Sequence, residues 1–389
     1  MSEWKEYKFS DFVSINPTVK MPTNEPISFV EMKDLVDGKK YCYPSSTRLK
    51  GGGAKFENQD TLFARITPCL ENGKICQVMG LKNGVGFGST EFLVFRGKSK
   101  VSDSDFVFYL SRWSEVRSHA EINLDGTSGR QRVPKDCFNE LILNLPESVL
   151  EQTAIASVLS SLDDKIDLLH RQNATLEKMA ETLFRQWFVE EAKEDWKEVS
   201  LFKAIELVGG GTPKTSLSKY WDGNVKWLSG GDIANNHKNF VVSSEKSITE
   251  LGLKNSSAKL LPKFSTVISA RGTVGKYCML SEPMAYSQSN YGILPKYKNC
   301  FFFTYLLVAY SVDELQSAAY GSVFDTITTN TFKGITITLP KETHIIWFEE
   351  TVKPYFFKIL ANRTQIRTLT ALRDTLLPKL MSGEVRVEV

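Results

Sequence analysis

The chain repeats itself at a long interval, and this repeat limits what it can fold into. Trp4-Lys-Glu-Tyr-Lys-Phe returns 192 residues later as Trp196-Lys-Glu-Val-Ser-Leu. Phe138-Asn-Glu-Leu-Ile-Leu-Asn-Leu-Pro returns 194 residues later as Phe332-Lys-Gly-Ile-Thr-Ile-Thr-Leu-Pro. An interval of this size is too long for a solenoid, whose repeats span roughly 20–50 residues. We therefore predict two copies of one unit, each a globular part of about 145 residues followed by a helix of about 40.

The repeat predicts an α+β fold with a pseudo-twofold internal duplication. Residues 1–145 and 196–340 are the two mixed α/β domains, and residues 146–195 and 341–389 are two long helical spacers. Apolar runs predict strands, and two amphipathic stretches predict one helix in each domain. The strands are expected at 92–95, 141–145, 265–269 and 334–339, and the helices at 106–115 and 301–315.

The helical spacers carry apolar residues at alternating intervals of four and three, which predicts a coiled coil. Each series is interrupted once by an asparagine, Asn173 in the first and Asn362 in the second. If the two asparagines face each other in an antiparallel pair, Leu176 meets Ile359 and Trp187 meets Phe348. The layer that joins Leu162 to Arg373 is imperfect in this alignment. A buried asparagine fixes the register of a coiled coil; the alternative is that both asparagines lie on a solvated edge.

The net charge of +3 hides an uneven distribution along the chain. Residues 1–145 carry 20 basic and 18 acidic side chains, and residues 196–340 carry 15 and 10. Residues 146–195 carry 5 basic and 11 acidic side chains. Basic domains joined by an acidic helix fit two contacts with a polyanion, although ordinary charge scatter explains the first domain equally well.

Composition and motifs exclude several classes of protein. No apolar run reaches the ~18 residues of a membrane span, and the first residues have no apolar stretch typical of a secretory signal. The six cysteines and four histidines are scattered, which argues against a zinc or disulfide framework and predicts reduced thiols in the cytoplasm. The glycine-rich strings at 51–55 and 209–215 lack a Walker A ending. Paired aspartates such as Asp163 and Asp164 are expected on solvated faces, so no catalytic residue is nominated.

Several strings in the right order resemble the specificity (S) subunit of type I restriction-modification systems. The resemblance covers essentially the whole chain, except that residues 339–346 lack the Glu-Gln pair of the first helix. The strings that carry it are Asp60-Thr-Leu-Phe-Ala-Arg-Ile-Thr-Pro, Gly210-Gly-Thr-Pro-Lys-Thr, Trp227-Leu-Ser-Gly-Gly-Asp-Ile, Ile268-Ser-Ala-Arg-Gly-Thr-Val-Gly-Lys and Leu376-Leu-Pro-Lys-Leu-Met-Ser-Gly-Glu.

The resemblance implies a non-catalytic DNA-recognition subunit. Each domain would be a target recognition domain that reads one half of a bipartite site in double-stranded DNA. The helices would dock two methyltransferase (M) subunits, and restriction/translocase (R) subunits would join the complex. S-adenosylmethionine, ATP and Mg²⁺ would then belong to the partner subunits, with no cofactor, metal or membrane contact in this chain.

Candidate DNA contacts follow from residue type, because bases are read by Arg, Lys, Asn, Gln and Ser side chains on loops and helices. Arg65 and Arg271 match in the repeat, and for them a structural role in a turn is the alternative. The predicted DNA contacts are Arg48, Lys50, Lys55, Arg130, Gln131 and Arg132 in the first domain, and Lys214, Lys219, Lys226, Asn235, Asn236, Arg271, Gln288 and Asn290 in the second.

A helical spacer of about 34 residues would extend ~50 Å at ~1.5 Å per residue. Two domains held by such a rod would leave an unread spacer between their half-sites, and a longer rod would lengthen that spacer. Two other hypotheses stay open from the sequence. One is a coiled-coil adaptor without DNA readout, and the other is an enzyme whose site has no familiar motif.

Overall fold

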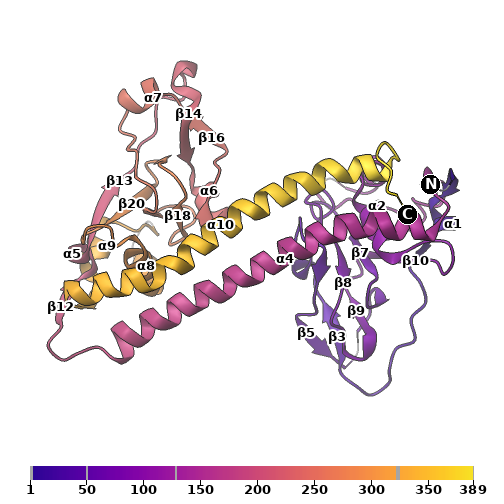
Figure 1. Ribbon diagram of the computed structural model, residues 1–389, viewed down its shortest axis with the longest axis horizontal. Helices are drawn as coiled ribbons and strands as arrows, with labels where there is room; N and C mark the ends of the chain where they lie inside the picture. Colours follow the sequence, from indigo (N-terminus) through magenta and orange to yellow (C-terminus); the bar gives the residue numbers. More distant parts are fainter. Residues whose placement is uncertain (1–2, 50, 128, 321–324, 389) are drawn as a thin grey trace. The chain divides into compact units, whose positions relative to one another are not determined.

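The computed structural model describes residues 3–49, 51–127, 129–320 and 325–388. These residues form two compact units, each with its own core (Figure 1). The first unit combines Met1–Leu168 with Ile366–Val389, and the second is Leu169–Gln365. Each unit therefore contains one globular domain together with part of each long helix.

A five-stranded sheet forms the centre of the first domain. Its strands lie in the order β2-β10-β7-β8-β4, and only the edge pair of β4 with β8 is parallel. The inner strand β7 is buried at all four of its residues, as expected for a strand covered on both faces. The strands are β2 (Val13–Ile15), β4 (Tyr41–Cys42), β7 (Thr61–Ala64), β8 (Ile75–Val78) and β10 (Phe92–Gly97).

The second domain repeats this sheet strand for strand. Its order is β13-β20-β17-β18-β15, again with one parallel pair, β15 with β18, at the edge. The fold-level duplication predicted from the sequence is therefore confirmed. The strands are β13 (Ile205–Gly209), β15 (Phe240–Val241), β17 (Thr266–Ser269), β18 (Tyr277–Leu280) and β20 (Asn290–Pro295).

A smaller second sheet shows where the two copies differ. The first domain has the order β5-β3-β9-β6, and the second has β16-β14-β19. The first domain thus has an additional edge strand, β6, which pairs with β9. The strands are β3 (Ile27–Val30), β5 (Ser46–Arg48), β6 (Lys55–Glu57) and β9 (Val85–Gly88) in the first domain, and β14 (Trp221–Leu228), β16 (Lys246–Ile248) and β19 (Ala285–Tyr286) in the second.

A two-stranded ribbon closes each domain just before its long helix. In the ribbons, β1 pairs with β11 and β12 with β21, both antiparallel. A four-residue helix, α1 or α5, follows the first strand of each ribbon. The ranges are β1 (Trp4–Lys8), β11 (Ile142–Pro146), β12 (Lys197–Ser200), β21 (Thr336–Leu339), α1 (Phe9–Phe12) and α5 (Leu201–Ala204).

The helix predicted over 106–115 is wrong in its extent. Two helices, α2 (Ser104–Arg112) and α3 (Ser114–Ile122), meet at Trp113, whose ψ of 140° is extended and ends the first helix. The second domain has one longer helix instead, α8 (Phe301–Tyr320). Short helices complete the domains: η1 (Met32–Asp34), η2 (Lys82–Gly84), η4 (Ser218–Tyr220), α6 (Gly230–Asn235), α7 (Glu250–Lys254) and α9 (Thr329–Gly334).

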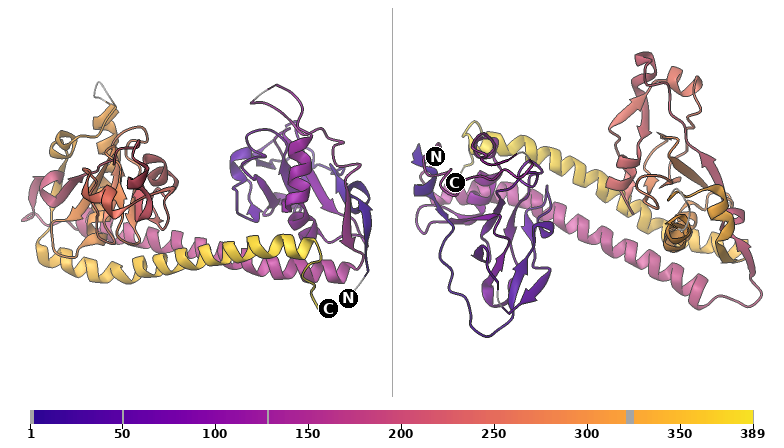
Figure 2. Two further views of the ribbon diagram at one scale, coloured as in Figure 1. Left: turned by 90° about the horizontal axis from the view of Figure 1, so that it is seen from above. Right: turned by 180° about the vertical axis from the view of Figure 1, so that it is seen from behind.

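The long helices α4 (Val149–Arg185) and α10 (Glu342–Met381) are each unbroken (Figure 2), and α4 continues into a π-helical turn, η3 (Gln186–Glu190). In the second unit, Asn362 Nδ2 donates to Asn173 Oδ1 at 2.8 Å, and both side chains are buried. Further along, the rings of Trp187 and Phe348 lie 5.5 Å apart. As α4 numbers rise, α10 numbers fall, so the predicted antiparallel register is confirmed here.

In the first unit, the imperfect layer of the predicted register is occupied by an ion pair. Arg373 Nη1 donates to Asp163 Oδ1 at 2.7 Å, one position along from Leu162. Asp163 is only 3% exposed, so its expected place on a solvated face is wrong. Asp164, in contrast, is exposed and accepts a hydrogen bond from Tyr41. An ionic partner explains why a basic residue lies in an otherwise apolar series.

Each domain core includes side chains from both long helices. In the first unit, Leu159 of α4 and Leu380 of α10 belong to the cluster that contains Phe63 and Phe95. In the second unit, Phe184 and Phe348 belong to the cluster of α8 and the five-stranded sheet. The helices are therefore part of both cores. Burial of a single Phe or Leu side chain stabilises a fold by roughly 1.5–3 kcal/mol. Within the described ranges, none of the helices is long and apolar enough to cross a membrane.

Candidate nucleic-acid interface

The two domains build the same loop junction beside the five-stranded sheet. In the first domain, Arg65 N donates to Glu91 O at 2.9 Å, and Val133 N donates to Arg65 O at 2.8 Å. In the second, Ala270 N donates to Ser289 O and Ile327 N donates to Ala270 O, both at 3.0 Å. We call these sites the first and second loop junctions, made by residues 65, 89–91 and 130–133 and by residues 270–271, 287–289 and 327.

The junctions correct one equivalence drawn from the repeat. Arg65 occupies the place of Ala270, because the two make the same backbone hydrogen bonds. Arg271 is therefore one position further along, and its side chain is exposed, whereas Arg65 is half-buried. The local sequence strings are alike, but the two arginines have different surroundings.

The basic loop Arg130–Arg132 is fixed at the first junction. Thr67 N donates to Gln131 O and Gln131 N donates to Thr67 Oγ1, both at 3.0 Å. Arg132 Nε donates to the two carboxylate oxygens of Glu91 at 2.9 and 3.0 Å, and this hydrogen bonding raises the pKa of Arg132. Arg130 is exposed, and none of its side-chain nitrogens has a hydrogen-bond partner among the described residues. The loop therefore presents one anchored and one available guanidinium.

Two other predicted residues belong to the small sheet of the first domain. Arg48 ends β5, where its guanidinium lies 3.5 Å from the ring centroid of Phe29 and pairs with Glu31 at 3.1 Å. Lys55 begins β6 and is exposed. Lys50 lies outside the described residues. Because Ala54 N donates to Ser89 O, the start of β6 is tied to the first loop junction.

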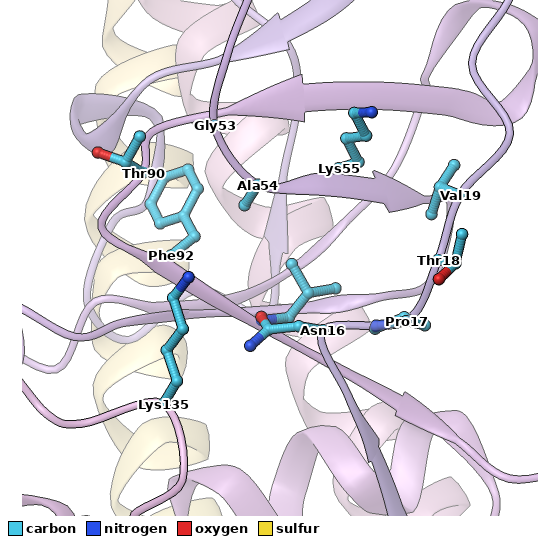
Figure 3. A pocket seen from close by; sticks show the side chains of 11 residues that line it. Asn16, Pro17, Thr18, Val19, Gly53, Ala54, Lys55, Thr90, Phe92 and Lys135 are labelled. Carbon is cyan, nitrogen blue, oxygen red and sulfur yellow. The ribbon is translucent and has the colours of Figure 1, made fainter.

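A cleft of about 590 Å³ lies between β6, the loop after β2 and the segment that enters β10 (Figure 3). Figure 3 shows Lys135 extending toward Phe92, while Lys55 rises from β6 on another side of the cleft. We call it the first-domain cleft. Its wall is formed by Asn16, Pro17, Thr18, Val19, Gly53, Ala54, Lys55, Thr90, Phe92, Val94 and Lys135.

At the second loop junction the predicted residues divide into exposed and buried ones. Arg271 and Gln288 are exposed, on loops that the Ser269–Asn290 strand pairing brings together. Asn290 is only 1% exposed, and its Nδ2 donates to Ser287 Oγ at 2.8 Å. The side chain of Asn290 thus shapes this loop, whereas Arg271 and Gln288 face solvent.

The predicted lysines of the second domain lie along one segment and its strand. Lys214 and Lys219 are exposed, and their backbone oxygens accept hydrogen bonds from Trp221 and Thr249. Lys226 lies within β14, where its Nζ donates to Val242 O at 2.7 Å and pairs with Glu282. Two of the three ammonium groups therefore remain open to an anion.

The asparagines after β14 lie at the end of α6. Asn235 is exposed, whereas Asn236 accepts from Arg363 Nη2 at 3.3 Å and donates to Asp232 O at 2.8 Å. The neighbouring His237 accepts from Tyr277 N at 3.3 Å, and partial burial lowers its pKa. Asn236 therefore attaches α6 to α10 within the second unit.

Sequence reasoning missed Asn16 and Lys135 in the first-domain cleft. Lys135 follows the predicted basic loop by three residues, and a longer window around that loop would have included it. Asn16 follows β2 with a φ of 49°, a backbone conformation that asparagine tolerates better than most residues. An Asn-Pro pair at the end of a strand is the only local signal for it.

The predicted site residues are basic and amide side chains. In the part of the chain that the structure describes, no group of three or more His, Cys, Asp or Glu side chains is placed to hold a metal ion. The exposed members of the predicted set are cationic or amide side chains, and Arg130, Arg132, Arg271 and Gln288 among them lie at the loop junctions. Fold and site together define a duplicated protein with one loop junction, carrying an exposed arginine, in each domain.

Comparison with known proteins places this fold in a family. Residues 1–178 and 193–350 match the family model described as "Type I restriction modification DNA specificity domain", and the chain belongs to that family. It is 25% identical over 470 residues to the type I restriction enzyme HindI specificity subunit of Haemophilus influenzae, which covers 99% of this chain and 100% of the relative. The MjaIX specificity subunit of Methanocaldococcus jannaschii is 26% identical over 73% of this chain and 70% of its own.

A solved structure shows the same fold. The S subunit of a type I restriction-modification system from M. genitalium superimposes with a TM-score of 0.61 and 15% identity. The match covers 100% of this chain and 97% of that one. At this identity the likeness concerns the fold, which the duplicated sheets described above share.

Proposed function

We propose that this chain is the specificity subunit of a type I restriction-modification complex and reads a bipartite site in double-stranded DNA, one half-site per domain. The observation that carries the proposal is the loop junction built twice by equivalent backbone hydrogen bonds. Arg130 is exposed at the first copy, and Arg271 and Gln288 are exposed at the second. A protein with two equivalent loop junctions fits a DNA target with two separate half-sites.

The structure allows the proposed contact set to be divided by role. Residues with exposed side chains are proposed to touch DNA: Arg48, Lys55, Arg130, Arg132, Lys214, Lys219, Asn235, Arg271 and Gln288. Gln131, Lys226, Asn236 and Asn290 are half-buried or buried, so we propose that they hold the loops that carry the contacts. Arginine and lysine supply most phosphate contacts, and arginine with glutamine supplies base readout.

We further propose that the long helices dock the partner subunits. Both helices expose large apolar side chains, among them Met179 at 43%, Trp347 at 67% and Phe357 at 46%. Exposed apolar groups on a helix favour a protein partner. Two methyltransferase subunits and restriction subunits in the cytoplasm are the proposed partners. Those subunits would supply S-adenosylmethionine, ATP and Mg²⁺ chemistry, and this chain would contribute no catalytic residue.

Methylome sequencing tests this proposal. Cells that express the chain with its methyltransferase partner should methylate one bipartite motif, and cells without the chain should not. A chimera that exchanges residues 196–340 for those of a relative should change one half of the motif and leave the other half intact. Methylation without a bipartite motif, or partner binding without any effect on DNA, would favour a plain coiled-coil adaptor.

A further inference from the structure

The first-domain cleft has no acidic residue in its wall. Its polar side chains are Asn16, Thr18, Lys55, Thr90 and Lys135, and the rest of the wall is apolar or glycine. All five polar groups can donate a hydrogen bond, and two of them are cations. A wall of this composition selects an anion that also presents an apolar surface.

The two lysines of the cleft have no ion-pair partner among the described residues, unlike several arginines of the same domain. Arg48 pairs with Glu31, Arg96 with Asp60, and Arg132 with Glu91. Lys55 and Lys135 make no ion pair with any residue that the structure describes. Both are exposed, so both ammonium groups are open to an external anion.

Asn16 is held so that one amide group remains for a ligand. Its backbone N donates to Val94 O at 2.7 Å, and its side-chain Oδ1 accepts from Val94 N at 3.0 Å. The Nδ2 group is then the part of this exposed side chain that is left to donate. Pro17 follows immediately, and its fixed φ restricts the loop. The cleft is therefore prepared before any ligand arrives.

The second domain differs at the matching strand. By the pairing of β2 with β10 and of β13 with β20, Val208 and Gly209 lie where Asn16 and Pro17 lie in the first domain, and Gly210 and Gly211 come next. A Cβ on Gly210 would lie 2.1 Å from Ser287 O, and one on Gly211 would lie 2.2 Å from Ala258 N. These two glycines let the loop after β13 pass close to the backbones of Ser287 and Ala258. Among the described residues, the second domain also has no strand equivalent to β6, which Lys55 begins.

We propose that the first-domain cleft seats the sugar–phosphate backbone of one DNA strand at the first half-site. Lys55 and Lys135 each bind a phosphate, Asn16 and Thr90 donate to phosphate or sugar oxygens, and the sugar packs on Pro17. This inference rests on the proposed function and gives the first domain an anchoring site for the DNA backbone. Phosphate contacts of this kind fix the position of a domain on DNA without reading sequence.

The first test measures binding at several salt concentrations. The probe is a duplex that contains the bipartite site found by methylome sequencing, and the protein is the full complex with its methyltransferase. Each phosphate contact contributes about 0.9 to the slope of log K against log salt. Lys55→Gln and Lys135→Gln should each lower the slope by about that amount and weaken binding roughly threefold to tenfold near 0.15 M salt. Lys82→Gln, at an exposed lysine outside the cleft, is the matched control.

The second test removes the charge from the DNA instead. Single methylphosphonate linkages are placed along the first half-site, and one or two adjacent positions should weaken wild-type binding. Those same positions should have no further effect on the Lys55→Gln, Lys135→Gln double variant. Methylphosphonates in the second half-site should weaken wild type and double variant equally.

The outcomes separate this inference from the proposed function. If the wild-type complex binds no bipartite site, the proposed function fails. If the complex binds the site but both lysine variants keep wild-type affinity and salt slope, only the cleft proposal is overturned. Loss of affinity that is equal for Lys82→Gln also overturns it, because the effect would then reflect general surface charge.

Discussion

Arg373 of α10 and Asp163 of α4 form a buried ion pair in the first unit, with their side chains only 3% and 2% exposed. Tyr109 of α2 donates to the second oxygen of Asp163 at 2.8 Å, and Arg373 also donates to Gly38 O at 2.8 Å. The pair thus joins both long helices to the first domain. A charge pair at such a position is costly to break, because Arg373 would keep only the exposed Asp374 as an ionic partner and Asp163 would keep none among the described residues.

Asp163→Leu should lower the free energy of unfolding by about 3–5 kcal/mol. The double variant Asp163→Leu with Arg373→Leu should lose less than Asp163→Leu alone, since no unpaired charge remains. Urea denaturation of the chain, followed by tryptophan fluorescence, measures both. The single variant Arg373→Leu completes the comparison. If the double variant loses as much unfolding free energy as Asp163→Leu and Arg373→Leu lose together, the two side chains are not coupled.

The buried asparagine pair is expected to lower the stability of the helix pair while it specifies a single register. Asn173 Nδ2 and Asn362 Oδ1 have no partner among the described residues, so the pair satisfies only half of its polar groups. Asn362→Leu alone should cost about 1–3 kcal/mol, because it leaves Asn173 fully unpaired. Replacing both with leucine should restore or raise stability and allow alternative helix registers. Cysteine cross-linking of single positions along α4 and α10 would detect those registers.

Glu349 predicts a pH dependence of the second unit. It accepts from Phe302 N and Phe303 N at 3.1 and 2.8 Å, and burial raises its pKa to about 7. As the pH rises, the unfolded state, with a pKa of 4.5, releases the Glu349 proton at a lower pH than the folded state does. The stabilising contribution is full below pH ~4.5 and is lost as the pH rises through 7, by about 3 kcal/mol.

The matched variant isolates this contribution. Glu349→Gln keeps an acceptor for the α8 backbone but cannot titrate. The difference in unfolding free energy between wild type and variant should therefore change between pH 5 and 8 in the direction given. A difference that stays constant over this range would mean that Glu349 does not titrate there.

The basic loop predicts unequal effects of two neighbouring arginines. Arg130 has no side-chain partner among the described residues, whereas Arg132 is held by Glu91 at the first loop junction. Arg130→Ala should lower the salt slope of DNA binding by about 0.9 with little change in stability. Arg132→Ala should also loosen the loop and leave the Glu91 carboxylate unpaired. At low salt, Arg132→Ala should therefore weaken DNA binding more than Arg130→Ala does. Equal, negligible effects would remove this loop from the interface.

The sequence was sufficient for the features that depend on periodicity. The duplication follows from strings that return after 192–194 residues, and the antiparallel register with its facing asparagines follows from the four-and-three spacing of apolar residues. The break at Trp113 and the burial of Asp163 do not follow, since both depend on what packs against a helix from another part of the chain. Asp163 looks solvated in its local string and is buried because Arg373 of α10 and Tyr109 of α2 lie against it.

The candidate site divides in the same way. Residue type identified Lys55, Arg130, Arg271 and Gln288 as polar residues open to solvent, and all four are exposed, although Lys55 begins β6 and does not lie on a loop. It did not separate Asn290, which is buried by a turn that only the strand pairing creates. The first-domain cleft depends on the approach of three distant segments, and no pattern within one segment predicts it.

The composition of the first unit has a consequence for how the chain folds as it is made. Leu380 and Met381 of α10 are buried in the same core as Phe9 and Phe63, more than 300 residues earlier. When the first domain leaves the ribosome, Leu380 and Met381 have not yet been synthesised. The apolar surface that they cover therefore stays exposed until the whole second domain has been made. Contacts of such long sequence separation slow folding and leave apolar surface open to aggregation. The domain made first is thus the domain completed last.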